Sequence, residues 1–113
     1  MRYRDLIVWQ KSMDLVDEVY RFCDRFPNDE RFGLWSQTTR AAVSVPSNIA
    51  EGSGRATSKE CVRFLSIARG SLYELATQLE IAERRGYGTV GDAMKERLNE
   101  IARMLTKMLS RKS

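Results

Sequence analysis

Apolar residues recur at helical spacing in four segments of the chain, and the first segment carries two apolar stripes. Within about Asp5 to Phe26, the stripes consist of Trp9, Met13, Val16, Tyr20 and Cys23, and of Leu15, Val19, Phe22 and Phe26. Together they cover about half of the helix circumference, which is more than one bundle core usually needs. The extra stripe is therefore expected either to lie under neighbouring helices or to meet another subunit. Asp5 is the expected N-cap, and Pro27 ends the helix because the residue before a proline disfavours the α conformation.

A second helix is predicted from about Asp29–Gly33 to Glu51, and it has an unusual polar face. The residues of this face recur at steps of three and four, so they lie along one side of the helix; they are Gln37, Arg40, Ser44, Asn48 and Glu51. Serine and asparagine are poor helix formers, and Pro46 in a helix interior costs roughly 3 kcal/mol. This face is therefore expected to serve packing or binding. Pro46 also lacks the N–H that would bond to the Ala42 carbonyl, which predicts a bend, and Gly52 and Gly54 end the helix.

A third helix is predicted from a capping box at Thr57 and Glu60 to about Arg85. Its apolar seam follows an unbroken heptad spacing and consists of Cys61, Leu65, Ala68, Leu72, Leu75, Leu79 and Ala82. Gly70 and Ser71 fall in its middle. Because an interior glycine costs roughly 1 kcal/mol against alanine, we expect a close approach at Gly70 by the small residues 41–47 of the second helix.

A fourth helix is predicted after the turn at Arg85-Gly86-Tyr87-Gly88, with Thr89 as its cap and Asp92 in its first turn. Its seam consists of Met94, Leu98, Ile101, Leu105 and Met108. Four amphipathic helices joined by short turns predict an all-α fold, an antiparallel up-down-up-down four-helix bundle. Residues 1–113 are expected to form a single domain, because this length supports one hydrophobic core.

Charge is unevenly distributed along the chain. The net charge is +4, but residues 1–54 carry seven Lys/Arg and eight Asp/Glu, whereas residues 55–113 carry twelve and seven. A basic half suggests an anionic partner such as nucleic acid, although a solvated helix face rich in Arg and Lys is an equally good interpretation of charge alone. Without a basic apolar leader or an apolar run of about 18 residues, the chain is expected to be cytoplasmic.

Basic residues recur at every fourth position in two places, which defines two ladders. The first consists of Arg55, Lys59 and Arg63, and the second of Arg103, Lys107 and Arg111. On a helix, each ladder forms a straight positive ridge suited to a phosphate backbone; coincidence combined with pairing inside a helix, such as Glu100 with Arg103, explains the pattern equally well. The segment 52–59 lacks the order of a phosphate-binding loop. The backbone N–H groups that its glycines leave accessible, next to Arg55 and Lys59, are able to bind one phosphate of a nucleic-acid backbone. The alternative interpretation is a plain turn.

The sequence contains no histidine, which excludes His-dependent hydrolases and most zinc sites. Cys23 and Cys61 lie far apart on apolar stripes and are expected to be buried free thiols. Catalysis needs a nucleophile with an activating base, and Ser44 or Ser71 near a carboxylate is not such a set. We therefore expect no enzymatic activity, no catalytic residue, no cofactor and no metal. Arg40 and Glu74 are expected to pair between the second and third helices if both point inward.

Nearly the whole chain resembles the four-helix-bundle proteins encoded in intervening sequences of bacterial 23S ribosomal RNA genes. The resemblance rests on DLIVWQKSMDL, FGLWSQTTRAAVSVPSNIAEGSGR, FLSIARGSLYELATQL and the closing RRGYG. It implies a ring-like homopentamer and a role tied to ribosomal RNA; a distantly similar group, the accessory proteins of diversity-generating retroelements, forms basic pentamers that engage nucleic acid and a reverse transcriptase. The family has no established catalytic residues to carry over. The matching motif positions are Gln37, Arg40, Ser44, Pro46, Asn48, Glu51, Gly52, Arg69, Gly70, Ser71 and Glu74.

Three functions follow as hypotheses. The leading one is a non-enzymatic oligomer that binds RNA or another nucleic acid through the two basic ladders. The second is a protein-interaction scaffold that docks a partner protein, or its own subunits, through the polar face of the second helix. The third is a small enzyme, which predicts a deep pocket with ionisable groups of strongly perturbed pKa.

Overall fold

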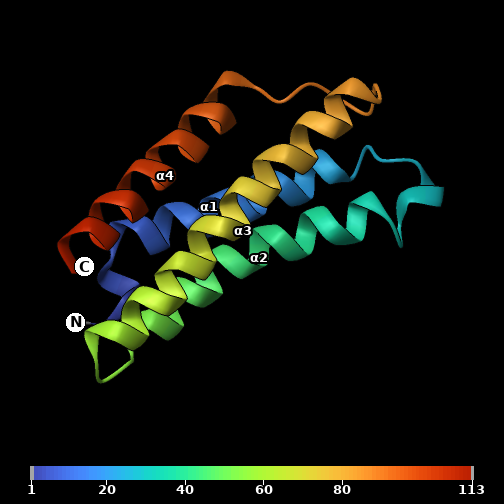
Figure 1. Ribbon diagram of the computed structural model, residues 1–113. Coiled ribbons are helices and arrows are strands. Elements are labelled where there is room, and N and C mark those ends of the chain that lie inside the picture. Colours follow the sequence, from blue (N-terminus) through green and yellow to red (C-terminus); the bar gives the residue numbers. More distant parts are fainter. Residues whose placement is uncertain (1, 113) are drawn as a thin grey trace.

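The computed structural model describes residues 2–112, and within this range the chain contains only helices and the turns between them. The four α-helices are α1 (Ile7–Cys23), α2 (Leu34–Ser53), α3 (Ser58–Arg84) and α4 (Asp92–Lys112), and the two short 3-10 helices are η1 (Tyr3–Asp5) and η2 (Asn28–Glu30). Figure 1 shows α2 and α3 side by side, with both chain ends at the end of the molecule where α2 turns into α3. The all-α class with four helices is thus confirmed. No helix in the described range is both long and apolar enough to cross a bilayer.

One hydrophobic core is shared by all four α-helices, and the heptad seam of α3 forms its centre. Every seam residue predicted for this helix is buried. The largest fully buried side chains are Leu15, Ile49, Leu65, Leu72, Leu75, Leu79, Ile101 and Leu105. Because these residues come from all four helices, removing one large side chain leaves a cavity lined by several of them.

Of the two apolar stripes on α1, the core takes the second. Leu15 and Val19 are completely buried, whereas Met13 is 42% exposed and Tyr20 is 40% exposed. The extra stripe is therefore the one that contains Trp9: its residues Trp9, Met13 and Val16 line an open groove between α1 and α2, whereas its last residue, Cys23, is buried in the core. Helical periodicity alone did not distinguish the two stripes because both are equally apolar.

The predicted caps have mixed outcomes. Thr57 caps α3 as expected, because its Oγ1 accepts the Glu60 N–H at 3.2 Å. Asp5 is not the N-cap of α1: it belongs to η1, and the helix begins after Leu6. Thr89 does not cap α4, which begins at Asp92. The Val90 N–H instead donates to the Glu83 carboxylate at 2.7 Å, which holds the chain in a non-helical turn before α4 starts.

The close approach expected at Gly70 occurs at Gly52 instead. A Cβ placed on Gly52 would lie 3.2 Å from the Cβ of Phe64 and 3.3 Å from the carbonyl oxygen of Cys61, so the end of α2 packs tightly on α3 there. A Cβ on Gly70 would meet nothing within 4 Å. Gly70 is exposed on the outside of α3, and the prediction of a close helix contact at this position is wrong. Pro46 is buried inside α2, which continues through it.

Candidate nucleic-acid interface

The first basic ladder lies at the turn into α3: Lys59 and Arg63 belong to the helix, whereas Arg55 precedes its first residue, Ser58. Two members of the ladder contact one aromatic ring. The Arg55 guanidinium forms an ion pair with Glu51 at 2.6 Å and lies 4.6 Å from the centre of the Phe64 ring. The Arg63 guanidinium lies 5.3 Å from the same ring. Lys59 is exposed. The charge of Arg55 is thus partly balanced by Glu51, whereas Lys59 and Arg63 have no carboxylate partner within residues 2–112 and remain available to an anion.

The second ladder runs along α4 and is also exposed. Arg103 lies 3.8 Å from Glu96, a loose pair between two solvated side chains. This is pairing inside a helix, as one of the two interpretations expected, although the partner is not Glu100, whose carboxylate binds the Lys11 ammonium of α1 at 2.9 Å. Lys107 and Arg111 are exposed and have no ion pair in the described part of the chain. Two of the three ladder charges therefore face solvent unpaired.

Arg69 connects the two helices that carry the ladders. Its Nη1 donates to the Thr106 hydroxyl of α4 at 3.3 Å. Thr106 directly precedes Lys107, and Arg69 follows Arg63 by less than two turns along α3. Sequence reasoning placed Arg69 in the family motif but did not include it in a basic surface, because it belongs to neither four-residue ladder. It adds a positive charge between the two ladders.

The motif residues of the polar face of α2 form a hydrogen-bonded cluster with α3. The hydroxyls of Ser44 and Ser71 lie 2.8 Å apart. The Asn48 side-chain amide donates to the Ser44 carbonyl at 2.8 Å and to its hydroxyl at 2.9 Å. These groups are half-buried, so the cluster satisfies polar atoms at the contact between the two helices. This part of the polar face serves packing within the subunit.

Arg40 and Glu74, in contrast, do not pair within the subunit. Both side chains are exposed, and the Glu74 carboxylate accepts a hydrogen bond from the Gln78 amide at 3.3 Å. The ion pair was expected only if both side chains pointed inward, and because both are exposed this condition is not met. Gln78 is itself buried, and its Oε1 has no hydrogen-bond partner, as is also true of the Thr38 hydroxyl. Neither buried oxygen was identified from the sequence, because both residues lie outside the stripe of small polar residues.

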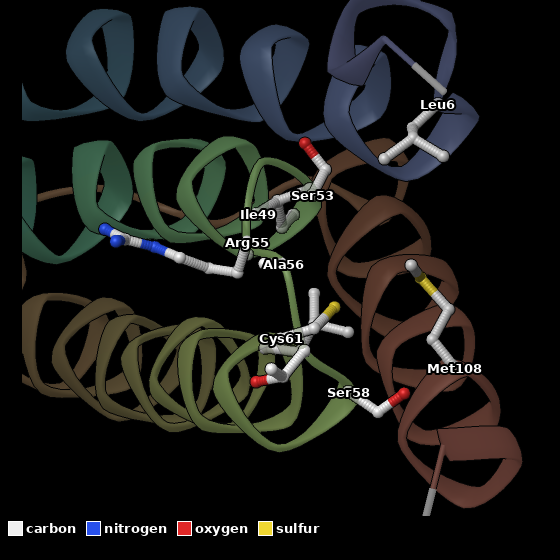
Figure 2. A pocket seen from close by; sticks show the side chains of 11 residues that line it. Leu6, Ile49, Ser53, Arg55, Ala56, Ser58, Cys61 and Met108 are labelled. Carbon is white, nitrogen blue, oxygen red and sulfur yellow. The ribbon is translucent and has the colours of Figure 1, made fainter.

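The turn between α2 and α3 covers a cavity of about 370 Å³ at one end of the bundle. Apolar side chains such as Ile49, Cys61 and Met108 form most of its wall, as Figure 2 shows. The Arg55 side chain extends away from Ser58 in this view and reaches Glu51 instead. Binding of one backbone phosphate by the first amides of α3 therefore stays a prediction, with a plain turn as the alternative.

Both cysteines are free and buried, as predicted. Burial, with a smaller contribution from the charge of Asp24, raises the pKa of the Cys23 thiol to about 12. No group of three or more Cys, Asp or Glu residues in the described range is arranged to hold a metal ion.

A second electrostatic cluster lies at the opposite end of the bundle from the first ladder. The Tyr87 hydroxyl donates to the Glu30 carboxylate at 2.7 Å, and the Leu34 N–H donates to its other oxygen at 3.1 Å. These two hydrogen bonds lower the pKa of Glu30, and the nearby Arg85 adds to the effect. The cluster ties the start of α2 to the loop that follows α3, and it positions no ladder residue.

Comparison with known families agrees with the helical architecture. No curated protein matches the chain. The family model described as 23S rRNA-intervening sequence protein matches residues 4–107, which includes α1, α2, α3, most of α4 and every motif position. The chain therefore belongs to the family of 23S rRNA-intervening sequence proteins.

Proposed function

We propose that this protein is a cytoplasmic, non-enzymatic oligomer that binds RNA or another nucleic acid through the basic ladders of α3 and α4. The observation that carries the proposal is the set of four unpaired, exposed cations: Lys59, Arg63, Lys107 and Arg111. Family membership supports an association with ribosomal RNA, since the family is named for the 23S rRNA intervening sequence. Phosphate contacts of this kind give salt-sensitive binding with little sequence selectivity.

Assembly strengthens the proposal. The resemblance to the family implies a ring-like homopentamer, and five copies would carry five times the net charge of +4. Once one subunit has bound a nucleic acid, the other subunits bind at a high effective concentration. Phosphate contacts that are weak on one subunit then combine to give the oligomer a higher affinity for the nucleic acid. The exposure of Met13 and Tyr20 on α1, 42% and 40%, also supports assembly, because a neighbouring copy would bury this apolar surface.

The proposed subunit is an antiparallel up-down-up-down bundle. For α2 and α3, the support comes from two contacts whose order is reversed along the helices. Ser44 meets Ser71, whereas Gly52, further along α2, meets Phe64, which lies earlier in α3. Short turns between consecutive helices favour the same arrangement for the rest of the bundle.

The test is binding of a fluorescent single-stranded RNA and a fluorescent DNA duplex, measured by polarisation over a salt series. The test variant is Lys59→Glu/Arg63→Glu. The matched control is Arg25→Glu/Arg31→Glu, which makes the same charge change at exposed positions outside both ladders. If each reversed residue contacts one phosphate, the slope of log K against log salt falls by roughly 0.7 per contact for single strands. We expect the ladder variant to lose at least tenfold in affinity and the control to lose little.

Two results would refute the proposal. One is the absence of binding to either nucleic acid at low salt. The other is an equal loss for the ladder variant and its control, which would mean that net charge alone governs the interaction. A matching pair on α4, Arg103→Glu/Lys107→Glu, tests whether both ladders contribute.

A second candidate function is a protein-interaction scaffold, and the exposed, unpaired Arg40 on the outer face of α2 favours it. In this case Arg40→Ala would change oligomer size or capture of a partner protein and leave nucleic-acid binding intact. Sedimentation and polarisation measurements on the same variant separate the two functions.

A further inference from the structure

The cavity under the turn between α2 and α3 has no part in the proposed function. Its volume is about 370 Å³. An apolar cavity of roughly 150 Å³ is enough to hold one benzene molecule, and the clefts that bind small molecules begin at roughly 300 Å³. The cavity is therefore large enough for a small organic ligand.

Most of the cavity wall is apolar, and its side chains come from or flank all four α-helices. They are Leu6 before α1, Ile49 of α2, Cys61 and Leu65 of α3, and Met108 of α4. Ile49 is completely buried and Leu65 is 1% exposed, so the floor of the cavity is the end of the hydrophobic core. Small residues in and beside the turn, Gly52, Ala56 and Ser58, leave the space above this floor unfilled.

The thiol of Cys61 is a polar group of this wall that the subunit does not use. Cys61 is 9% exposed, and in Figure 2 its sulfur points into the space between Ile49 and Met108. The thiol forms no disulfide and no hydrogen bond within residues 2–112. A thiol is only a weak hydrogen-bond donor, whereas a buried water needs two to four polar partners. This part of the cavity therefore suits an apolar occupant better than water.

One side of the cavity is polar and carries free hydrogen-bond donors. Ser58 is the first residue of α3, and its hydroxyl has no hydrogen-bond partner in the described part of the chain. The Thr57 hydroxyl accepts the Glu60 N–H, but the N–H groups of Ser58 and Lys59 come too early in the helix to find a carbonyl partner within it. These donors lie at the positive end of the helix dipole, which favours a negatively charged group.

We propose that this cavity binds a medium-chain carboxylic acid whose carboxylate lies at the first N–H groups of α3. The hydrocarbon chain lies between Ile49, Cys61 and Met108. At the roughly 25 Å³ per carbon atom that benzene needs, 370 Å³ gives an upper limit of roughly fifteen carbons, and a chain of about ten fits. A nucleic-acid phosphate could use the same donors but would leave the apolar wall uncovered. The inference goes beyond the proposed function and does not depend on it.

The first test is isothermal titration calorimetry of the full chain with decanoate as the probe. We expect saturable binding of one decanoate per chain. Each buried CH₂ group raises the affinity about fourfold, so hexanoate should bind at least tenfold more weakly. Decanol has no carboxylate for the N–H groups and should also bind at least tenfold more weakly. The inference is overturned if decanoate does not bind, or if either of the other two compounds binds as tightly.

A second test places a charge in the apolar wall. Met108→Asp puts a carboxylate beside the hydrocarbon chain, and we expect it to weaken decanoate binding at least tenfold. The matched control is Met104→Asp: both methionines of α4 are half-buried against the core, but Met104 does not line the cavity. Circular dichroism shows whether each variant is folded. An equal loss of affinity in the two folded variants would contradict the proposed position of the chain.

A third test removes donors from the polar side. Ser58→Pro deletes both the hydroxyl and the N–H of this residue, and proline is well tolerated at the first position of a helix. The preceding Thr57 has a ψ of 151°, which is the extended conformation that a proline requires before it. We expect Ser58→Pro to weaken decanoate binding about tenfold and to leave decanol binding unchanged. Unchanged decanoate binding would show that the carboxylate lies elsewhere.

A fourth test uses the Cys61 thiol to locate the ligand. The rate of alkylation by iodoacetamide is followed for each cysteine by peptide mass spectrometry, and saturating decanoate should slow the reaction of Cys61 at least tenfold. Cys23 is 1% exposed and lies outside the cavity, so it serves as the internal reference. An unchanged rate at Cys61 would mean that decanoate binds at another place, and the inference would fall. Failure of RNA to bind in the polarisation assay concerns only the nucleic-acid proposal.

Discussion

The same substitution at two glycines is expected to have opposite effects on the free energy of unfolding. Gly70→Ala places a methyl group in open space on the middle of α3, where it meets nothing within 4 Å. Alanine is favoured over glycine in a helix interior by roughly 1 kcal/mol, so this variant should be more stable by about that amount. For a chain of this size, the gain corresponds to a rise in melting temperature of about 4 °C.

Gly52→Ala should destabilise the subunit. The new methyl would lie 3.2 Å from the Phe64 Cβ and 3.3 Å from the Cys61 carbonyl oxygen, and neither atom is the end of a flexible side chain. Gly52 is also the penultimate residue of α2, so the gain in helix propensity is small. Displacing packed atoms costs typically 1–3 kcal/mol, and we expect a loss of about 1 kcal/mol.

The assay is urea unfolding followed by circular dichroism at 222 nm. Both substitutions are measured over a range of protein concentrations, which separates any contribution of association from the stability of the subunit. The opposite sign at either position would contradict the reasoning. A destabilising Gly70→Ala would mean that this position does contact the rest of its own subunit. A stabilising Gly52→Ala would mean that α2 and α3 are not closely packed at their junction.

Three other predictions follow from the contacts in the subunit. A double-mutant cycle of Ser44→Ala and Ser71→Ala should give a coupling of about 1 kcal/mol in urea unfolding, because the two hydroxyls share one hydrogen bond. Ile101→Ala should cost about 2–5 kcal/mol in the same assay, since it removes a fully buried side chain, and a loss below 1 kcal/mol would contradict its central position. Tyr87→Phe should lower the melting temperature near neutral pH, because it removes the hydrogen bond that lowers the pKa of Glu30 in the folded protein. The difference in melting temperature between the variant and the unaltered protein should narrow as pH falls below 4.5. The stability that this hydrogen bond contributes is present above the ordinary pKa of Glu30 and is lost as pH falls through its lowered pKa in the folded protein.

The parts of the fold that could be predicted are those encoded by local sequence. The seam of α3 follows a heptad spacing over three heptads, and Thr57 with Glu60 forms a cap from residues three positions apart. Such signals depend on helix geometry alone. The predicted caps at Asp5 and Thr89 failed because contacts outside the helix decide where α1 and α4 begin. In the second case, the carboxylate that holds Val90 comes from the preceding helix.

Contacts between helices were the part that sequence reasoning could not supply. It identified an extra apolar stripe on α1 but could not tell which stripe is buried, because Leu15 and Met13 are equally apolar. It recognised that a glycine on α3 needs an explanation, yet the tight approach lies at Gly52. For the candidate site, the sequence predicted two positive ridges. It did not predict that the guanidiniums of Arg55 and Arg63, in one ladder, both lie over the Phe64 ring. In each case the answer depends on which faces of two helices meet, and periodicity within one helix carries no such information.

Seven of the eleven motif positions fall into two groups once their contacts are known. Ser44, Asn48, Gly52 and Ser71 hold α2 against α3, so the stability of one subunit explains them. Arg40, Gly70 and Glu74 contribute no helix contact or ion pair to the subunit, and Gly70 lowers its stability. A side chain or a glycine that costs stability inside the chain has to be explained by something outside it.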